Sequence, residues 1–377
     1  MTDTPVGIYV HWPFCQAKCP YCDFNSHVVP SVDQSDWRTA FEAEIDRHAA
    51  LIPDRIVGSI FFGGGTPSLM EGETVAAVID RIQRRWRMVN DPEITLEANP
   101  TSVEADRFRA YRAAGVNRIS MGIQALDDGD LKRLGRLHSV AEARAAFDVA
   151  RTTFERVSFD LIYARQNQSL DQWRVELQEA LNMAADHLSL YQLTIEDGTA
   201  FGERYRRGAL RGLPSDDLSA DMYEVTQEIC DAHGMPAYEI SNHARAEARS
   251  RHNMIYWSGG DYVGLGPGAH GRLTLDGRRH ATEAVMAPIP WLERVRAGEA
   301  PDRADPLSVE DVASEYAMMA LRVREGAELR HLRTIDSLDS KISSLEDFGL
   351  VEVGGERVRL TDRGRPLLNA ILREILA

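Results

Sequence analysis

The sequence predicts an α/β fold with a parallel sheet, because β-prone apolar runs alternate with amphipathic stretches through its first half. Six runs are predicted as strands, at residues 7–11, 59–62, 93–98, 118–123, 157–162 and 187–195. Amphipathic stretches predicted as helices lie between them, at residues 36–51, 75–87, 102–114, 141–153 and 170–184. This alternation is typical of parallel strands joined by crossover helices. Six such units suit either an open doubly wound sheet or an incomplete barrel.

Composition excludes several function classes. The 377 residues carry a formal net charge of −15, which argues against a general nucleic-acid binder. No apolar run approaches the ~20 residues that a membrane-spanning helix needs. The first residues, MTDTPV, do not form a charged-then-apolar leader. We therefore expect a cytoplasmic protein that does not bind nucleic acid.

Three of the four cysteines lie close together after the first predicted strand. They are Cys15, Cys19 and Cys22, in the pattern C-x3-C-x2-C. Cys230 is the only other cysteine, so the three have no fourth nearby to complete disulfide pairs. Structural zinc is one interpretation, with His11 and His27 completing the ligand set. The other is a [4Fe–4S] cluster in which one iron has no protein ligand and can accept a small molecule.

Polar residues also mark the ends of the later predicted strands. Glu97, Gln124, Asp160 and Thr194 lie at or near the ends of the third to sixth strands. In barrels and open α/β sheets, functional side chains gather at the carboxyl ends of the strands. Each residue alone could be a satisfied core polar group, but four at successive strand ends favour a site. Arg136 could bind a carboxylate through two parallel hydrogen bonds, or it could be a solvated surface arginine.

The cysteine pattern and a glycine-rich segment together resemble the radical S-adenosylmethionine (SAM) superfamily. Tyr21 stands before the last cysteine, and GGGTP at residues 63–67 follows the apolar run SIFF. In that family, the open iron of a [4Fe–4S] cluster binds the methionine part of SAM. The resemblance therefore implies a cluster held by the three cysteines. It also favours a partial (β/α)6 TIM-like barrel over the open sheet.

Further motifs resemble the HemN/HemW group of that superfamily, and the likeness covers nearly the whole chain. They include Y-x-H-x-P-F-C at residues 9–15, G-x-Q at 122–124 and FDLIY at 159–163. The residues that this resemblance assigns to a SAM pocket are Tyr9, Tyr21, Gly64, Gly65, Thr66, Glu97, Gln124, Arg136, Asp160 and Thr194.

Two departures favour the HemW branch, which contains haem chaperones. Oxygen-independent coproporphyrinogen III oxidases have a fourth cysteine, C-x3-C-x2-C-x-C, and a longer N-terminal arm. Here Asp23 and Phe24 follow Cys22, and only fourteen residues precede Cys15. The resemblance implies that the chain binds a cluster, SAM and haem, and that it delivers haem to acceptor proteins. Respiratory proteins are among the expected acceptors, and transient contacts with membrane proteins are expected. The alternative is the oxidase itself, a radical SAM dehydrogenase of porphyrin biosynthesis.

A second motif, H-N-x-x-Y-W at residues 252–257, also matches the HemW branch. The imidazole of His252 could ligate haem iron, and Tyr256 and Trp257 could pack on the porphyrin plane. The alternative is a loop anchored by its aromatic pair, with His252 hydrogen-bonded to backbone. The glycine-dense run at 264–271 is predicted to close the barrel floor or to contact a ligand, and it contains a second candidate ligand, His270.

The chain is predicted to have three parts. Residues 1–234 form the barrel with its cluster, 235–300 close the barrel, and 301–377 form a C-terminal domain. Helices predicted at 308–324, 328–334 and 337–348, and a hairpin at 350–360, outline a winged-helix-like α+β domain. Its mixed charge favours a lid or a partner surface over DNA binding.

Overall fold

The computed structural model describes residues 4–101 and 107–377. All six predicted strands are present, and each pairs in parallel with its neighbour in chain order. They are β1 (Val6–Trp12), β4 (Ile56–Gly64), β5 (Arg87–Ala98), β6 (Arg118–Gln124), β7 (Arg156–Tyr163) and β8 (His187–Gln192).

The later part of the chain extends this sheet at both edges. The added strands are β9 (Asn242–Ala244), β10 (Tyr262–Leu265), β11 (His270–Leu275), β12 (Arg278–Ala284) and β13 (Asp302–Pro306). The strand order is β13-β12-β11-β10-β1-β4-β5-β6-β7-β8-β9, with β10 parallel to β1 and the outer strands antiparallel. In the described residues, β13 and β9 are separate edges, so the barrel is a partial one.

Two details differ from the sequence-based expectations. The glycine-dense run at 264–271 is the end of β10, a turn and the start of β11, so it extends the sheet. Strand β13 pairs with β12 in the large sheet, although residues from 301 onward were predicted to belong to the C-terminal domain. Short polar strands such as these have little apolar alternation, so the sequence pattern does not reveal them.

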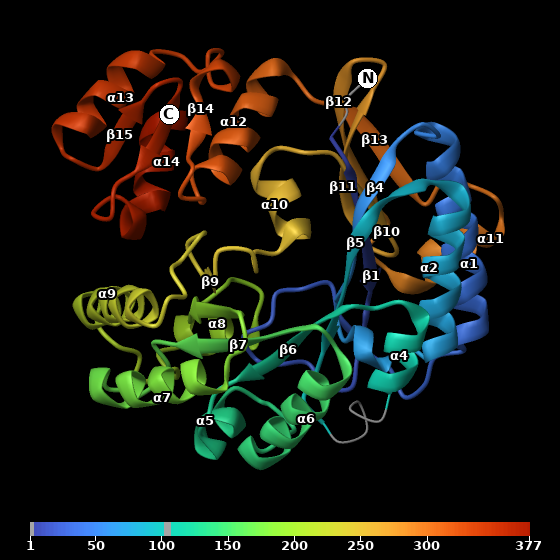
Figure 1. Ribbon diagram of the computed structural model, residues 1–377, viewed down its shortest axis with the longest axis horizontal. Helices are drawn as coiled ribbons and strands as arrows, with labels where there is room; N and C mark the ends of the chain where they lie inside the picture. Colours follow the sequence, from blue (N-terminus) through green and yellow to red (C-terminus); the bar gives the residue numbers. More distant parts are fainter. Residues whose placement is uncertain (1–3, 102–106) are drawn as a thin grey trace.

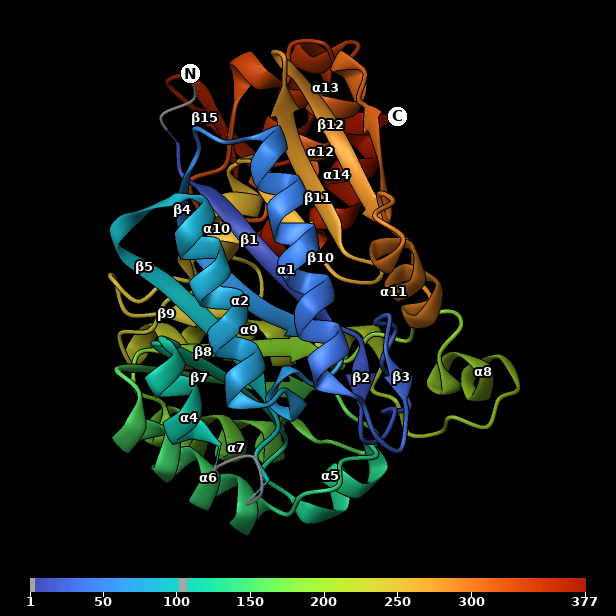
Figure 2. The same cartoon turned by 90° about the vertical axis from the view of Figure 1, so that its right-hand side faces the viewer.

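Helices cover the outer face of the sheet, as Figures 1 and 2 show. Those predicted are α1 (Gln34–Leu51), α2 (Gly72–Arg85), α4 (Phe108–Ala114), α6 (Val140–Thr153) and α7 (Leu170–Met183). Residues 102–106 of the predicted helix 102–114 lie outside the described residues. The described barrel part also contains α5 (Asp128–Arg133), α8 (Ala200–Arg206), α9 (Asp216–Ala232), α10 (Arg251–Trp257) and α11 (Pro288–Arg296). Among the described helices, none combines the length and apolar character needed to cross a membrane.

Alternation along the strands separates an apolar outer layer from a polar interior. In β1, Val6, Ile8 and Val10 are fully buried in the main apolar core beneath the helices. The residues between them face the other way, so that Tyr9 hydrogen-bonds within the barrel interior. Helix ends are fixed locally, as in α6, where Ser139 and Glu142 form a capping box. The interior is therefore available for polar chemistry, while the helices stabilise the sheet from outside.

The C-terminal elements have an apolar cluster of their own. They are α12 (Val309–Ala320), β14 (Ala327–Glu328), α13 (Leu338–Asp347), β15 (Val351–Gly354), β16 (Arg357–Leu360) and α14 (Leu368–Leu376). The predicted hairpin is present, with its turn at Gly355 and Glu356, and the strand order is β14-β16-β15. The helix predicted at 328–334 is only a short 3-10 turn, η2 (Leu329–His331). Helix α10 packs between β4 and α12, where it joins the barrel to this cluster (Figure 1).

Candidate functional site

The cysteine loop leaves the end of β1 and is held at both of its stems. The short strands β2 (Phe14–Cys15) and β3 (His27–Val28) pair with each other, and the amide of His27 donates to the Pro13 carbonyl at 2.7 Å. Behind them three buried aromatic rings pack edge to face. The Phe14 ring centroid is 5.2 Å from that of Trp12 and 5.0 Å from that of Trp37. The aromatic core thus fixes where the loop begins and ends.

The thiols of Cys15, Cys19 and Cys22 line a single cavity of about 1010 Å³. Thr66 Oγ1 donates to Cys15 Sγ at 3.3 Å, and Arg136 Nη1 donates to Cys19 Sγ at 3.4 Å. Burial raises the pKa of the Cys15 and Cys22 thiols. Three sulfurs on one loop with donors aimed at two of them fit a [4Fe–4S] cluster, whose properties depend on hydrogen bonds to sulfur.

Cys230 lies away from the cysteine loop, and the candidate zinc ligands His11 and His27 are hydrogen-bonded within the protein. Cys230 is fully buried in the main apolar core on α9. His11 Nδ1 hydrogen-bonds to Tyr9 OH at 3.0 Å, and its Nε2 to the Asn25 carbonyl at 2.9 Å. His27 Nε2 is 3.0 Å from Asn25 Oδ1. Because both His11 nitrogens are used inside the protein, that residue does not fit the zinc alternative.

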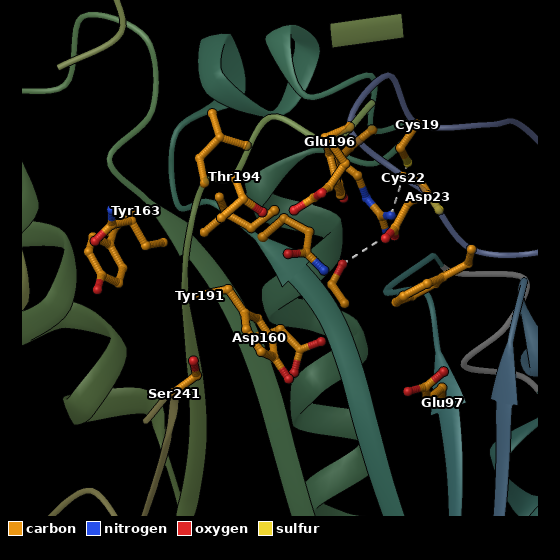
Figure 3. A pocket seen from close by; sticks show the side chains of 18 of the residues that line it. Cys19, Cys22, Asp23, Glu97, Asp160, Tyr163, Tyr191, Thr194, Glu196 and Ser241 are labelled. Carbon is orange, nitrogen blue, oxygen red and sulfur yellow. Dashed lines mark hydrogen bonds between the residues drawn. The ribbon is translucent and has the colours of Figure 1, made fainter. Parts of the chain in front are cut away.

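The cavity lies at the carboxyl ends of the parallel strands, where it also receives most of the predicted SAM residues. Figure 3 shows Cys19 and Cys22 on one side of it and Tyr163 on the other. The predicted residues that line it are Tyr21, Gly64, Gly65, Thr66, Glu97, Gln124, Arg136, Asp160 and Thr194. Tyr9 is not among the lining residues; it lies deeper in the barrel, where its ring stacks on Phe61 with centroids 6.3 Å apart.

The glycine segment after β4 packs against the cysteine loop. A Cβ atom on Gly65 would lie 2.7 Å from the Phe14 carbonyl oxygen, and one on Gly64 would lie 2.6 Å from the His11 ring. Gly64 also has a φ of +106°, which side chains other than glycine rarely adopt. The close approach that these glycines permit is therefore first of all to the strand that carries Cys15, an arrangement that the sequence motif alone did not reveal.

Two carboxyl groups face the cavity from β5 and β7. Burial, with a smaller effect from the nearby Asp160 charge, raises the pKa of Glu97 to about 8. Burial raises the pKa of Asp160 to about 7, an effect that the Ser189 hydroxyl and then Arg118 and Arg136 oppose. Both groups therefore titrate near neutral pH. A cationic ligand beside them would favour their ionised forms and would itself be held by them.

Arg136 is positioned by the ends of two strands. Its Nη2 donates to Asn99 Oδ1 at 2.6 Å and to the Gly122 carbonyl at 2.9 Å. Beside it, Gln124 ends β6 with a φ of +75°, an unfavourable backbone conformation for a residue with a side chain. Such strained positions cluster at binding sites. The guanidinium is thereby held near the cysteine loop.

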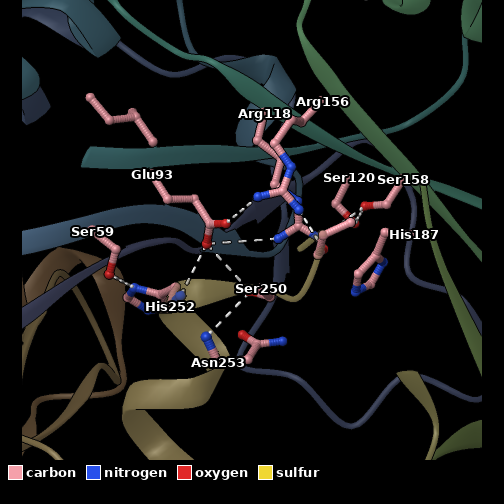
Figure 4. Close-up of polar contacts among 12 residues, drawn as sticks. Ser59, Glu93, Arg118, Ser120, Arg156, Ser158, His187, Ser250, His252 and Asn253 are labelled. Carbon is pink, nitrogen blue, oxygen red and sulfur yellow. Dashed lines mark hydrogen bonds and ion pairs between the residues drawn. The ribbon is translucent and has the colours of Figure 1, made fainter. Parts of the chain in front are cut away.

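His252 is not among the residues that line the cavity, and it lies among the polar side chains around Ser59 and Glu93 (Figure 4). Its exposed fraction is 0%. Its Nδ1 is 2.8 Å from Ser59 Oγ, its Nε2 is 2.5 Å from Tyr256 OH, and its backbone amide donates to Glu93 Oε1 at 3.0 Å. Burial lowers its pKa to about 3, so the ring is neutral.

This arrangement does not support His252 as a haem ligand. Both of its ring nitrogens are hydrogen-bonded, which leaves none for iron. The alternative of an anchored aromatic segment describes it better, although the partners are side chains rather than backbone. His270, the second candidate, is exposed at the start of β11.

The cavity also contains residues that sequence reasoning missed. Tyr191 follows Ser189 by two residues in β8, so both lie on the same face of the strand. The period of two along that strand could therefore have identified Tyr191. Ser241, Arg322 and Arg365 line the cavity from beyond the barrel strands. No local motif marks them, because only tertiary packing brings them to the site.

Comparisons with known proteins identify the family of the chain. A family model described as the radical SAM superfamily matches residues 9–178. The chain is 37% identical over 386 residues to radical S-adenosyl methionine domain-containing protein 1, mitochondrial, of Bos taurus, covering 98% of this chain and 87% of that protein. It is 36% identical over 381 residues to the heme chaperone HemW of Escherichia coli, covering 99% and 98% of the two.

A solved structure confirms the fold. The Escherichia coli coproporphyrinogen III oxidase HemN superposes with a TM-score of 0.82 at 21% identity, over 99% of this chain and 90% of that one. At this identity the likeness shows a shared fold only. The superfamily implies a [4Fe–4S] cluster and SAM, to which the cysteine loop and its cavity correspond. The chain therefore belongs to the radical SAM superfamily and, within it, to the HemW group.

Proposed function

We propose that the chain is a haem chaperone that holds a [4Fe–4S] cluster on Cys15, Cys19 and Cys22 and binds SAM in the adjoining cavity. In this proposal it also binds haem and delivers it to acceptor proteins. The observation that carries the cofactor part is the single cavity shared by the three thiols and the polar strand ends. The end-to-end likeness to relatives named heme chaperone supports the haem part.

The proposed roles follow from the chemistry of each group. A [4Fe–4S] cluster with an open iron supplies a binding point for the amino and carboxylate groups of SAM. Arg136, held by Asn99 and Gly122, would neutralise the carboxylate with charge-assisted hydrogen bonds. Glu97 and Asp160 would accept hydrogen bonds from the rest of the molecule or balance its positive charge.

With both ring nitrogens of His252 already hydrogen-bonded, the proposal places haem at the cavity. The cavity has a volume of about 1010 Å³, slightly above the roughly 300–1,000 Å³ common for a single ligand. The proposal also includes respiratory proteins among the acceptors, transient contacts with membrane proteins and a cytoplasmic location.

Oxidation of coproporphyrinogen III is the alternative function, and the chain is expected not to catalyse it at a significant rate. The likeness to the HemN structure does not favour the alternative, because it establishes the fold alone. At the cysteine loop, Asp23 and Phe24 stand where the oxidase pattern continues to a fourth cysteine.

One sample can test the proposal against its alternative. The protein is reconstituted anaerobically, its iron content is measured, and SAM and haem are titrated into separate portions. The remaining portion receives coproporphyrinogen III, SAM and a reductant. The proposal expects four irons, binding of both ligands and no protoporphyrinogen IX. Robust product formation, or failure to bind haem, would overturn it.

A further inference from the structure

A buried arginine with no counter-ion among the described residues lines the end of the cavity near the C-terminal domain. Arg365 belongs to the short 3-10 helix η3 (Arg365–Leu367) and is only 4% exposed. Its Nε and Nη2 atoms are buried with no hydrogen-bond partner in the described part of the chain. A buried unpaired charge is costly, so a group of this kind calls for an explanation.

The neighbours of this guanidinium do not neutralise it. The buried Tyr223 hydroxyl lies beside it: burial raises the pKa of that hydroxyl, and the Arg365 charge opposes the rise. Among the described residues the hydroxyl has no hydrogen-bond partner. The nearby Glu239 carboxylate is already occupied, because Arg322 donates to one oxygen at 2.8 Å and the Ser241 amide to the other at 2.9 Å. His243 confirms the positive field, since burial and then the Arg365 charge lower its pKa to about 3.

Two acidic residues line the same cavity but do not pair with Arg365 among the described contacts. Asp216 and Asp217 are exposed at the start of α9 and line the cavity, but neither forms an ion pair with Arg365 among the described contacts. Apolar side chains line the same cavity as the guanidinium, among them Ile240, Leu367 and Leu368. An anionic group attached to an apolar body would satisfy both features.

We propose that Arg365, with the Tyr223 hydroxyl and the neighbouring Arg322, is a carboxylate-binding subsite that holds a propionate tail of haem at the C-terminal end of the cavity. The inference rests on the proposed haem-binding function. Guanidinium groups bind carboxylates through two parallel hydrogen bonds, and Nε and Nη2 form one edge suited to that geometry. Haem combines a flat apolar ring with carboxylate tails, which matches the apolar wall and the unpaired cation.

The test uses the full chain with its cluster and compares two probes. Ferric haem and its dimethyl ester, which lacks the carboxylates, are titrated by Soret absorbance into wild type, Arg365→Met, Arg365→Lys and Arg363→Met. Arg363 is an exposed neighbour in the sequence and serves as the matched control. SAM affinity is measured on the same proteins by calorimetry.

The expected result is specific to the carboxylate. Arg365→Met should weaken haem binding about tenfold or more, which corresponds to about 1.4 kcal/mol. Wild type should bind the dimethyl ester about as weakly as Arg365→Met binds haem. Arg365→Met should change the affinity for the ester no more than about twofold. Arg365→Lys should fall between, while Arg363→Met and SAM binding should be unchanged.

Other outcomes separate the possible errors. If wild type binds haem and ester equally well, the subsite is wrong and haem binding itself stands; this comparison needs no variant and decides even if Arg365→Met does not fold. Equal losses of SAM and haem in Arg365→Met would make the residue structural and overturn the inference. A wild-type protein that binds no haem would overturn the proposed function together with the subsite.

Discussion

Replacing His252 with glutamine should make the protein less sensitive to acid. His252 is buried and neutral, with a pKa near 3 in the folded chain against an ordinary value of 6.5. Because the folded pKa is the lower one, protonation favours the unfolded chain. The stability associated with the neutral ring is fully present above pH 6.5 and is lost as the pH falls toward 3.

The size of this effect follows from the shift. Each pH unit below 6.5 lowers the free energy of unfolding by about 1.4 kcal/mol, so the loss at pH 4.5 is about 3 kcal/mol. Glutamine cannot titrate, and the variant should escape that loss. It should also be less stable than wild type at neutral pH, because the bonds to Ser59 and Tyr256 are altered.

The assay is thermal melting of the cluster-free protein at pH 7.5, 6.5, 5.5 and 4.5. Between the first and last pH, the melting temperature of His252→Gln should fall roughly 3–4 °C less than that of wild type. His233→Gln, at an exposed histidine, is the control and should follow wild type. Equal falls in wild type and His252→Gln would refute the reasoning. The haem spectrum of the folded variant should match wild type, and a changed Soret band would return the ligand role to His252.

Three further predictions concern the cluster and SAM. Cys19→Ala should abolish the visible absorbance of the reconstituted cluster, whereas Cys230→Ala should retain it; full iron content in Cys19→Ala would contradict the ligand assignment. Gly65→Val should lose the cluster and SAM together, because its Cβ would meet the Phe14 carbonyl oxygen at 2.7 Å, and an intact cluster spectrum would disprove this. Arg136→Met should weaken SAM binding in calorimetry about tenfold or more, since charge-assisted hydrogen bonds are lost; unchanged affinity would place the SAM carboxylate elsewhere.

The parallel strands and their polar ends could be predicted because their signals are local. β1 and β4 are apolar runs with a period of two, and Glu97 and Asp160 follow from the rule on strand ends. Strands β10 to β13 were missed because they are short, polar or rich in glycine. The role of Arg365 could not be predicted, because it depends on the guanidinium being buried without a hydrogen-bond partner among the described residues, which only the folded structure shows.

The hydrogen bonds of the His252 ring could not be predicted for a related reason. A histidine next to two aromatic residues has the same sequence whether its ring nitrogens are free or occupied. Only the packing of α10 against β4 shows that Ser59 and Tyr256 already use them. The sequence thus identifies residue types that suit a ligand, but it does not show which of them remain available.

The anchoring of the cysteine loop has a consequence for the order in which the protein matures. The Asn25 carboxamide donates to the carbonyls of Pro267 and Met286, at 3.0 and 2.9 Å, more than 240 residues later in the chain. During synthesis the three cysteines emerge early, but their loop lacks this support until those carbonyls have been made. Cluster insertion should therefore be a late event. A fragment ending at residue 260 should take up iron less completely than the full chain, and equal uptake would show that the early part suffices.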